Sequence, residues 1–266
     1  MKSNLRQEFL YQVFALLLAA IVVHAVYVTL VRPQAEEDLA RQREQAAQIE
    51  DYVPERSIFI VLRDFEQEAC FILMFWAMAI MGFKARGALR ERSLLEGSLI
   101  PVPEGISILP EDSREYMRPI QALAPEQREF LLPRTLLSAL QRFASTRNVQ
   151  DVSEAVRSLC DSESDRLDAE LAMVRYIAWA IPSIGFIGTV RGIGDALGQA
   201  NRAVEGDIAG VTESLGVAFN STFIALVISI VIMFLMHQLQ LLQDRLVLDT
   251  QAYADSRLIR HLQVRE

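Results

Sequence analysis

The sequence has few residues of the kinds that build catalytic or metal sites. It contains only two cysteines, Cys70 and Cys160, and three histidines in 266 residues. Cys70 lies in an apolar run and Cys160 in a charged, helix-like segment, so neither a disulfide nor a metal site is expected. There is no zinc-ligand spacing, no phosphate-binding GxxxxGK loop and no nucleophile elbow. We therefore expect a protein that is not an enzyme and that holds no cofactor and no metal.

Basic residues are also in the minority. The chain has 26 Lys and Arg against 34 Asp and Glu, a formal net charge of −8. Proteins that bind nucleic acid concentrate Lys and Arg on the surface that meets the phosphates. Nucleic acid is therefore not an expected partner.

Apolar residues are abundant, at 52% of the chain. Residues 9–31 and 215–236 are each long enough to cross a hydrocarbon core of about 30 Å at about 1.5 Å per residue. Two shorter runs, residues 69–83 and 176–190, reach that length with their neighbours. The sequence predicts an all-α membrane protein with four transmembrane helices, so a lipid bilayer surrounds it.

The flanking charges predict the orientation of these spans. Four basic residues follow the second span closely: Lys84, Arg86, Arg90 and Arg92. The stretch 32–56 instead holds seven acids and four arginines. Because positive charge marks the cytoplasmic side, both termini and the section after the second span are expected in the cytoplasm. The first span is too long for a signal-peptide core and is expected to remain as an anchor.

Four sections follow from this arrangement. They are an N-terminal transmembrane hairpin with an external connection at 32–56, a cytoplasmic helical insert, the third and fourth membrane helices, and a cytoplasmic C-terminal helix: residues 1–83, 84–175, 176–240 and 241–266. Six of the nine prolines lie between Pro101 and Pro133, so that part of the insert is expected to be irregular.

Small residues follow one face of each of the last two spans. In the third span this face has spacings of 3, 4, 3 and 4, and comprises Pro182, Gly185, Thr189, Gly192 and Ala196. In the fourth span the face has spacings of 4, 3 and 4, and comprises Ala218, Thr222, Ala225 and Ser229, with Asn220 and Ser221 beside the threonine. Small faces let helix backbones approach closely in lipid. Two interpretations stay open: plain helix packing, with each threonine bonded to a carbonyl one turn earlier, or a polar path lined by both threonines.

Two ionisable residues lie within the third span. Such groups are costly in a bilayer and are functional candidates by default. Arg191 and Asp195 stand at i and i+4, and we expect them to form a structural ion pair. Arg191 also lies about 22 Å from the cytoplasmic end of the span, where its side chain can snorkel to the external interface.

Two segments resemble a known family. IPSIGFIGTVRGIGDAL, residues 181–197, resembles the P-x-x-G-x-x-GTV-x-G segment of the MotA/TolQ/ExbB proton-channel family. SLGVAFNSTFIALVIS, residues 214–229, resembles the last membrane helix of that family. The resemblance covers roughly residues 166–245. Four spans with an insert between the second and third resemble the flagellar stator subunit more than the three-span members.

The resemblance implies an architecture and a function. Members form a homopentamer in the bacterial inner membrane around the single membrane helices of a dimer of MotB/ExbD/TolR-like partners, each with an essential aspartate. Protons, or in some members sodium ions, cross at this interface and drive rotation. The threonines that line the path in the family map onto Thr189 and Thr222, so residues 176–240 are expected to line the channel.

The other residues of the two small faces take expected roles from the same resemblance. Asn220, Ser221 and Ser229 would add oxygens to the ion pathway, which suits sodium ions as well as protons. The side-chain-poor positions are expected to face the pore: Pro182, Gly185, Gly192, Ala196, Ala218 and Ala225.

Two functions from different classes remain open. The first is the ion-channel subunit of an inner-membrane motor complex that converts ion motive force into mechanical work. The second is a passive membrane scaffold whose cytoplasmic helices recruit partner proteins. Two threonines in matching faces favour the first. The work itself could be flagellar rotation, gliding, outer-membrane energisation or phage defence.

Overall fold

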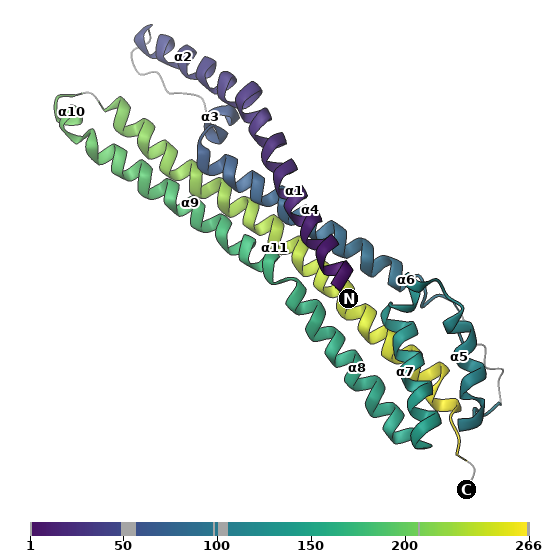
Figure 1. Cartoon of the computed structure of the whole chain (residues 1–266). Helices are drawn as coiled ribbons and strands as arrows, with labels where there is room; N and C mark the ends of the chain where they lie inside the picture. The colour runs from purple at the N-terminus through teal and green to yellow at the C-terminus, as the bar shows by residue number, and fades with distance from the viewer. Residues whose placement is uncertain (1, 49–56, 98, 101–105, 207, 265–266) are drawn as a thin grey trace. The chain divides into compact units, whose positions relative to one another are not determined.

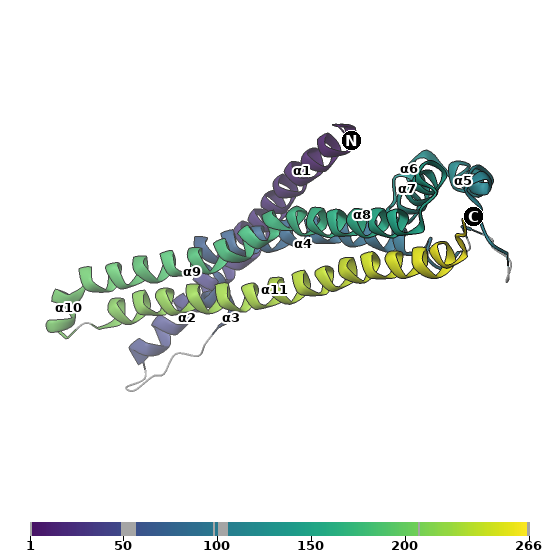
Figure 2. The same cartoon turned by 90° about the horizontal axis from the view of Figure 1, so that it is seen from below.

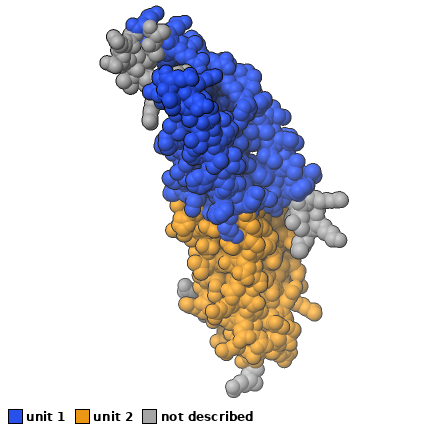
Figure 3. Space-filling view, turned by 90° about the vertical axis from the view of Figure 1, so that its left-hand side faces the viewer, with its two compact units in different colours: residues 1–81, 173–236 blue, residues 82–172, 237–266 orange. Residues whose placement is uncertain are grey.

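A computed structural model describes residues 2–48, 57–97, 99–100, 106–206 and 208–264, and the regular elements among them are helices. Part of the predicted external connection, residues 49–56, lies outside the described residues, as do 98 and 101–105 of the insert and 265–266 of the tail. The chain divides into two compact units, one of residues 1–81 and 173–236 and one of residues 82–172 and 237–266 (Figure 3). We describe each unit by itself. The four sections predicted from the sequence are defined by their expected place inside or outside the membrane. The division into compact units does not test that placement, so the four sections stay predictions.

The first unit is built from long helices (Figure 1). A continuous helical stretch opens the chain, with one π-helical turn inside it, as α1 (Lys2–Val26), η1 (Tyr27–Val31) and α2 (Arg32–Gln48). The remaining elements that contribute to this unit are α3 (Ile58–Leu62), α4 (Phe65–Arg92), α9 (Ala172–Gly198), α10 (Ala200–Val204) and α11 (Ala209–Arg257). α4, α9 and α11 extend beyond the bounds of the first unit, and the helical pattern of the carboxyl segment continues through Arg257.

Four helical stretches among the described residues are long and apolar enough to cross a membrane, judged by length and composition: Gln7–Gln45, Phe65–Arg92, Val149–Gly198 and Ala209–His261. Large apolar side chains cover their surfaces. Trp179 is 81% exposed and Phe219 is 70% exposed. Such surfaces suit hydrocarbon rather than water. The prediction of four spans is confirmed, and the chain is a multi-pass membrane protein.

Polar contacts tie α1 to α4 within the first unit. The indole nitrogen of Trp76 donates a hydrogen bond to the Gln12 carbonyl oxygen at 2.9 Å. Near the π-helical turn, the buried carboxylate of Glu68 accepts from Arg32 and lies 2.6 Å from Nδ1 of His24. A buried carboxylate is costly unless it is paired, and here a cation lies beside it. The start of α4 is therefore tied by charge to the first helix.

The second unit is a small helical bundle. Its own elements are η2 (Pro110–Asp112), α5 (Ser113–Gln121), α6 (Pro125–Arg128), α7 (Leu131–Thr146), α8 (Val149–Glu170) and η3 (Ile259–His261). The proline-rich section is expected to be irregular, and its described residues include short helices, two of which have Pro110 or Pro125 in their first turn. The core consists mainly of apolar residues of α7 with partners from α5, α8 and α11, among them Ile120, Leu136, Leu140, Phe143, Val152 and Ala254.

The α7–α8 connection has two capping devices. α7 ends at Arg147, whose φ of 53° and ψ of 30° lie in the left-handed region, and whose N–H donates to the Phe143 carbonyl at 3.0 Å. The side chain of Asn148 then caps α8 by accepting from the N–H of Gln150 at 2.9 Å. The chain thus reverses within two residues.

Candidate functional site

A close helix contact in the first unit lies between α9 and α11, which run antiparallel and side by side in both views (Figures 1 and 2). A Cβ placed on Gly185 would lie 2.5 Å from the Cβ of Ala225, and one on Gly192 would lie 2.6 Å from the Ser214 carbonyl oxygen. Only glycine allows the backbones to come this close. We call this contact the α9–α11 seam. It comprises Gly185, Gly188, Thr189 and Gly192 of α9 and Ser214, Ala218, Ser221, Thr222 and Ala225 of α11.

The small residues of the seam contact one another within one chain. Ala218 and Ala225 are fully buried, and three more members of the small faces are buried with them, namely Gly185, Gly192 and Ala196. Within a single chain the two small faces therefore bury each other, because the glycines allow backbone contact. The pore-facing role of these five positions stays a prediction. Pro182 is half-buried inside α9, and its pore-facing role stays a prediction.

The two threonines meet at the seam. Their hydroxyls form a hydrogen bond with each other. Thr189 Oγ1 also lies 3.1 Å from the Ala218 carbonyl oxygen, and Thr222 Oγ1 lies 3.2 Å from the Gly185 carbonyl oxygen. A hydroxyl has one proton to donate and two lone pairs, so the cluster can exchange donors and acceptors without moving its helices. Thr189 Oγ1 also lies 3.3 Å from the Gly185 carbonyl one turn earlier, as the packing interpretation expects. The polar path stays a prediction.

The seam has two different edges. Thr189 and Thr222 are half-buried and form the first edge, which is partly open to the surroundings. The residues that immediately precede them, Gly188 and Ser221, are buried and form the second edge. At that edge a Cβ on Gly188 would lie 2.5 Å from the Ser221 hydroxyl oxygen and 3.2 Å from Cγ of Glu66 in α4. The second edge is therefore closed by α4.

The other predicted pathway residues lie apart from the hydroxyl pair. Ser221 Oγ is buried without a hydrogen-bond partner among the described residues. Ser229 is buried, and its hydroxyl donates to the Ala178 carbonyl at 3.2 Å. Asn220 is half-buried on α11. The structure thus brings Thr189 and Thr222 together and places the three remaining oxygens elsewhere along α11.

Arg191 pairs with α4 and not with its own helix. Its Nε and Nη2 donate to the two carboxylate oxygens of Glu66, each at 2.8 Å, and Nη2 lies 3.7 Å from Oδ1 of Asp64. This corrects the predicted ion pair between Arg191 and Asp195. Asp195 is exposed one turn further along, whereas Glu66 offers both oxygens in the planar geometry that a guanidinium matches.

Sequence reasoning missed Glu66 as a partner of this site. The available signal was its position in the charged start of the second span, near one end of that helix, with Arg191 in the later part of an antiparallel span. Two further ion pairs lie at this end of the unit: Glu213 is 2.9 Å from Arg63 and 3.3 Å from Arg43. The seam is therefore bordered by a network of charges at its α10 end.

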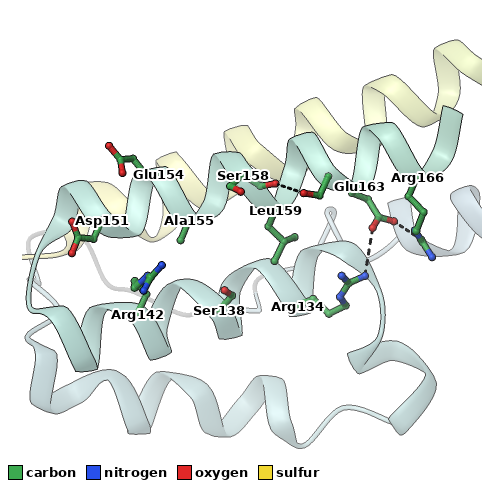
Figure 4. A pocket seen from close by; sticks show the side chains of 11 residues that line it. Arg134, Ser138, Arg142, Asp151, Glu154, Ala155, Ser158, Leu159, Glu163 and Arg166 are labelled. Carbon is green, nitrogen blue, oxygen red and sulfur yellow. Dashed lines mark hydrogen bonds and ion pairs between the residues drawn. The ribbon is translucent and has the colours of Figure 1, made fainter. Parts of the chain in front are cut away.

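The second unit has a groove of its own, of about 750 Å³, between α7 and α8 (Figure 4). Apart from Leu159, its lining side chains are small or charged: Arg134, Ser138, Arg142, Asp151, Glu154, Ala155, Ser158, Ser162, Glu163 and Arg166. Within it the buried carboxylate of Glu163 pairs with Arg134 at 3.5 Å and with Arg166. Among the described residues no group of His, Cys, Asp and Glu is arranged to hold a metal ion.

One comparison with known proteins gives a match, and it covers the seam. Residues 127–252, which include α9, the seam and most of α11, match the model of the MotA/TolQ/ExbB proton channel family. No curated protein and no solved structure matches the chain. The family is one of proton channels and not of enzymes, and the match implies an ion-channel subunit. The resemblance that the glycine-rich segment predicts is therefore confirmed over residues 127–252, which match the model of the MotA/TolQ/ExbB proton channel family.

Proposed function

We propose that this chain is the ion-channel subunit of a membrane motor, in which ion flow past the Thr189–Thr222 edge of the seam drives mechanical work. The observation that carries the proposal is the hydroxyl pair itself, half-buried at an edge that no other helix of the described chain closes completely. Hydroxyls that exchange donor and acceptor roles can serve a carboxyl group in both its protonated and ionised forms.

The proposal requires a titrating acid from another chain. A carboxylate in the membrane core cannot remain ionised without polar company. Glu66 reaches the seam from the side of α4, where Arg191 already neutralises it. An acid on the threonine edge would therefore come from a partner with a single membrane helix that carries an essential aspartate.

The assembly follows the family. In this proposal five copies surround two MotB/ExbD/TolR-like helices in the bacterial inner membrane, with both termini of each copy in the cytoplasm. The conducted ion is H⁺, with Na⁺ as the alternative that the oxygens of Asn220, Ser221 and Ser229 would suit. Because five helix pairs face two inner helices, ion transfer at one interface turns the ring toward the next.

The test is ion flux through vesicles that contain the chain and the single-span protein encoded beside it. Thr189→Val and Thr222→Val keep the side-chain shape and remove the hydroxyls. We expect each to abolish flux driven by a pH gradient while the complex still assembles. The matched control is Ser183→Ala, because Ser183 is exposed on the same helix and its hydroxyl donates only to the Trp179 carbonyl of its own helix, at 3.0 Å. Full flux in both valine variants would refute the pathway.

The alternative function is a passive scaffold, and the groove between α7 and α8 is the observation in its favour. A scaffold would conduct no ions, and charge substitutions in the groove at Arg142 and Asp151 would abolish recruitment of its partner. In the motor the same substitutions leave the ion flux of reconstituted vesicles unchanged. Measuring flux and partner capture on the same variants separates the two functions.

A further inference from the structure

We propose that Glu66 and Arg191 form a positioning pair that sets the rotation of α9, so that Thr189 points at Thr222. This inference rests on the proposed function of the hydroxyl pair. It assigns a role to the one arginine of the glycine-rich segment and to an acid on α4 that lies outside the two channel-lining helices.

The pair fixes an orientation because it is bidentate. The two N–H groups of Arg191 that face α4 each donate a hydrogen bond to a different carboxylate oxygen of Glu66, at 2.8 Å. Two parallel hydrogen bonds define a plane, whereas a single bond would allow the side chains to swivel. The Glu66 side chain is only 11% exposed, and the Arg191 side chain is 42% exposed, so the acid is the more firmly held partner.

Helix geometry transmits this orientation to the threonine. Residues of an α-helix advance about 100° each, so Arg191 and Thr189 point in directions about 200° apart. A contact that holds the Arg191 side of α9 against α4 therefore also sets the direction of the side chains on the opposite side of α9, Thr189 among them. Any rotation of α9 that moves Arg191 away from Glu66 also turns the Thr189 hydroxyl away from Thr222.

Gly188 makes the three-helix contact possible. It is the point at which α9 lies against both Ser221 of α11 and Glu66 of α4, and there is no room for a side chain. Glu66 therefore contacts the seam itself as well as the arginine. The network partner Glu213, by contrast, pairs with Arg63 and Arg43 and with no residue of α9.

The experiment measures the geometry of the seam separately from ion flow. Cysteines replace Thr189 and Thr222 in the full chain with Cys70→Ala and Cys160→Ala, and the rate of disulfide formation under mild oxidant is measured in native membranes. Glu66→Gln and Arg191→Leu are added singly, and Glu213→Gln is the matched control. We expect the two test variants to slow cross-linking by about tenfold and the control to leave it unchanged, because a misplacement of about 1 Å can cost up to about 10²-fold in reactivity.

A charge exchange tests whether the pair itself is responsible. Glu66→Arg combined with Arg191→Glu should restore much of the cross-linking and, in chains that retain both threonines, much of the ion flux. If neither single variant changes the cross-linking rate, or if Glu213→Gln changes it equally, the positioning role is wrong. Loss in both singles without restoration in the exchange would also overturn it, since a particular side chain and not the pair would then be required.

The two proposals can fail separately. Cross-linking that depends on Glu66 and Arg191 in a parent protein that conducts no ions would keep the positioning pair and refute the proposed function. Ion flux that requires both threonines, with cross-linking insensitive to Glu66 and Arg191, would keep the function and refute the positioning pair.

Discussion

Gly185 of α9 and Ala225 of α11 pack so closely that a methyl group added to the glycine would lie 2.5 Å from the alanine methyl. The same added methyl would lie 3.2 Å from the Ser221 carbonyl oxygen. Backbone atoms surround the site, so a side chain cannot be accommodated by a rotamer change. The hydroxyl pair exists because the helices are this close.

Alanine at Gly185 should therefore destabilise the protein. We expect Gly185→Ala to lower the free energy of unfolding by about 1–3 kcal/mol, because overpacking forces α9 and α11 apart. Gly194→Ala and Gly216→Ala are the controls, since no atom lies within 4 Å of an added Cβ at either position. There alanine should be neutral or stabilising by about 0.5–1 kcal/mol. Thermal unfolding in detergent checks this, and equal losses in all three variants would contradict it.

Glu163 should be the most costly carboxylate to remove from the α7–α8 groove. Its side chain is 6% exposed and pairs with two arginines, which are themselves 40% and 54% exposed. We expect Glu163→Ala to cost about 1–2 kcal/mol of stability, less than a fully buried pair would, because the arginines can turn to solvent. Glu154→Ala, at an exposed position of the same groove, should stay within about 0.5 kcal/mol. Similar losses for both would show that the pairing contributes nothing.

Arg147 is a position at which a substitution should stabilise the fold. Its φ of 53° is unfavourable for a residue with a side chain, at roughly 1–2 kcal/mol. Arg147→Gly removes this strain and also an exposed pair with Glu111 at 3.2 Å, which is worth at most about 1 kcal/mol. We expect a net gain of up to about 1 kcal/mol in chemical unfolding. The comparison is Arg147→Ala, which keeps the strain and loses the pair, and should be less stable than the original chain.

Glu91 supplies a cap from one helix to another. Its Oε2 accepts from the N–H of Leu131 at 2.9 Å, at the first residue of α7. Removing this acceptor in Glu91→Ala should cost about 1 kcal/mol, as for other lost N-terminal caps. Glu91→Gln retains an oxygen that can accept the same bond and should lose less. Hydrogen exchange of the first turn of α7 reports the effect directly, and unchanged protection in the alanine variant would contradict it.

The sequence predicts the membrane class well because that class depends on composition and length. Runs such as residues 9–31 and 215–236 have no other stable environment than hydrocarbon, so four spans can be counted without any knowledge of packing. The threonines are also predictable, since helical spacing places Thr189 and Thr222 on faces that each carry small residues. Their mutual hydrogen bond follows once the two faces meet.

Helical spacing does not predict which helix packs against each small face. By spacing alone, the small positions could equally surround a helix of another chain or pack against each other. In the structure of the single chain they pack against each other, as the close approach at Gly192 shows. The pairing of Arg191 failed for a related reason. Helical periodicity predicts ion-pair partners only on the same helix, such as Asp195. Glu66 lies on another helix, 125 positions away in sequence.

The most direct test of the central claim is a density map of this chain in complex with its single-span partner. We predict that the edge formed by Thr189 and Thr222 faces the membrane helix of the partner, with the acidic side chain of that helix at the level of the two hydroxyls. A map in which that edge faces lipid, with the partner bound elsewhere, would contradict the account.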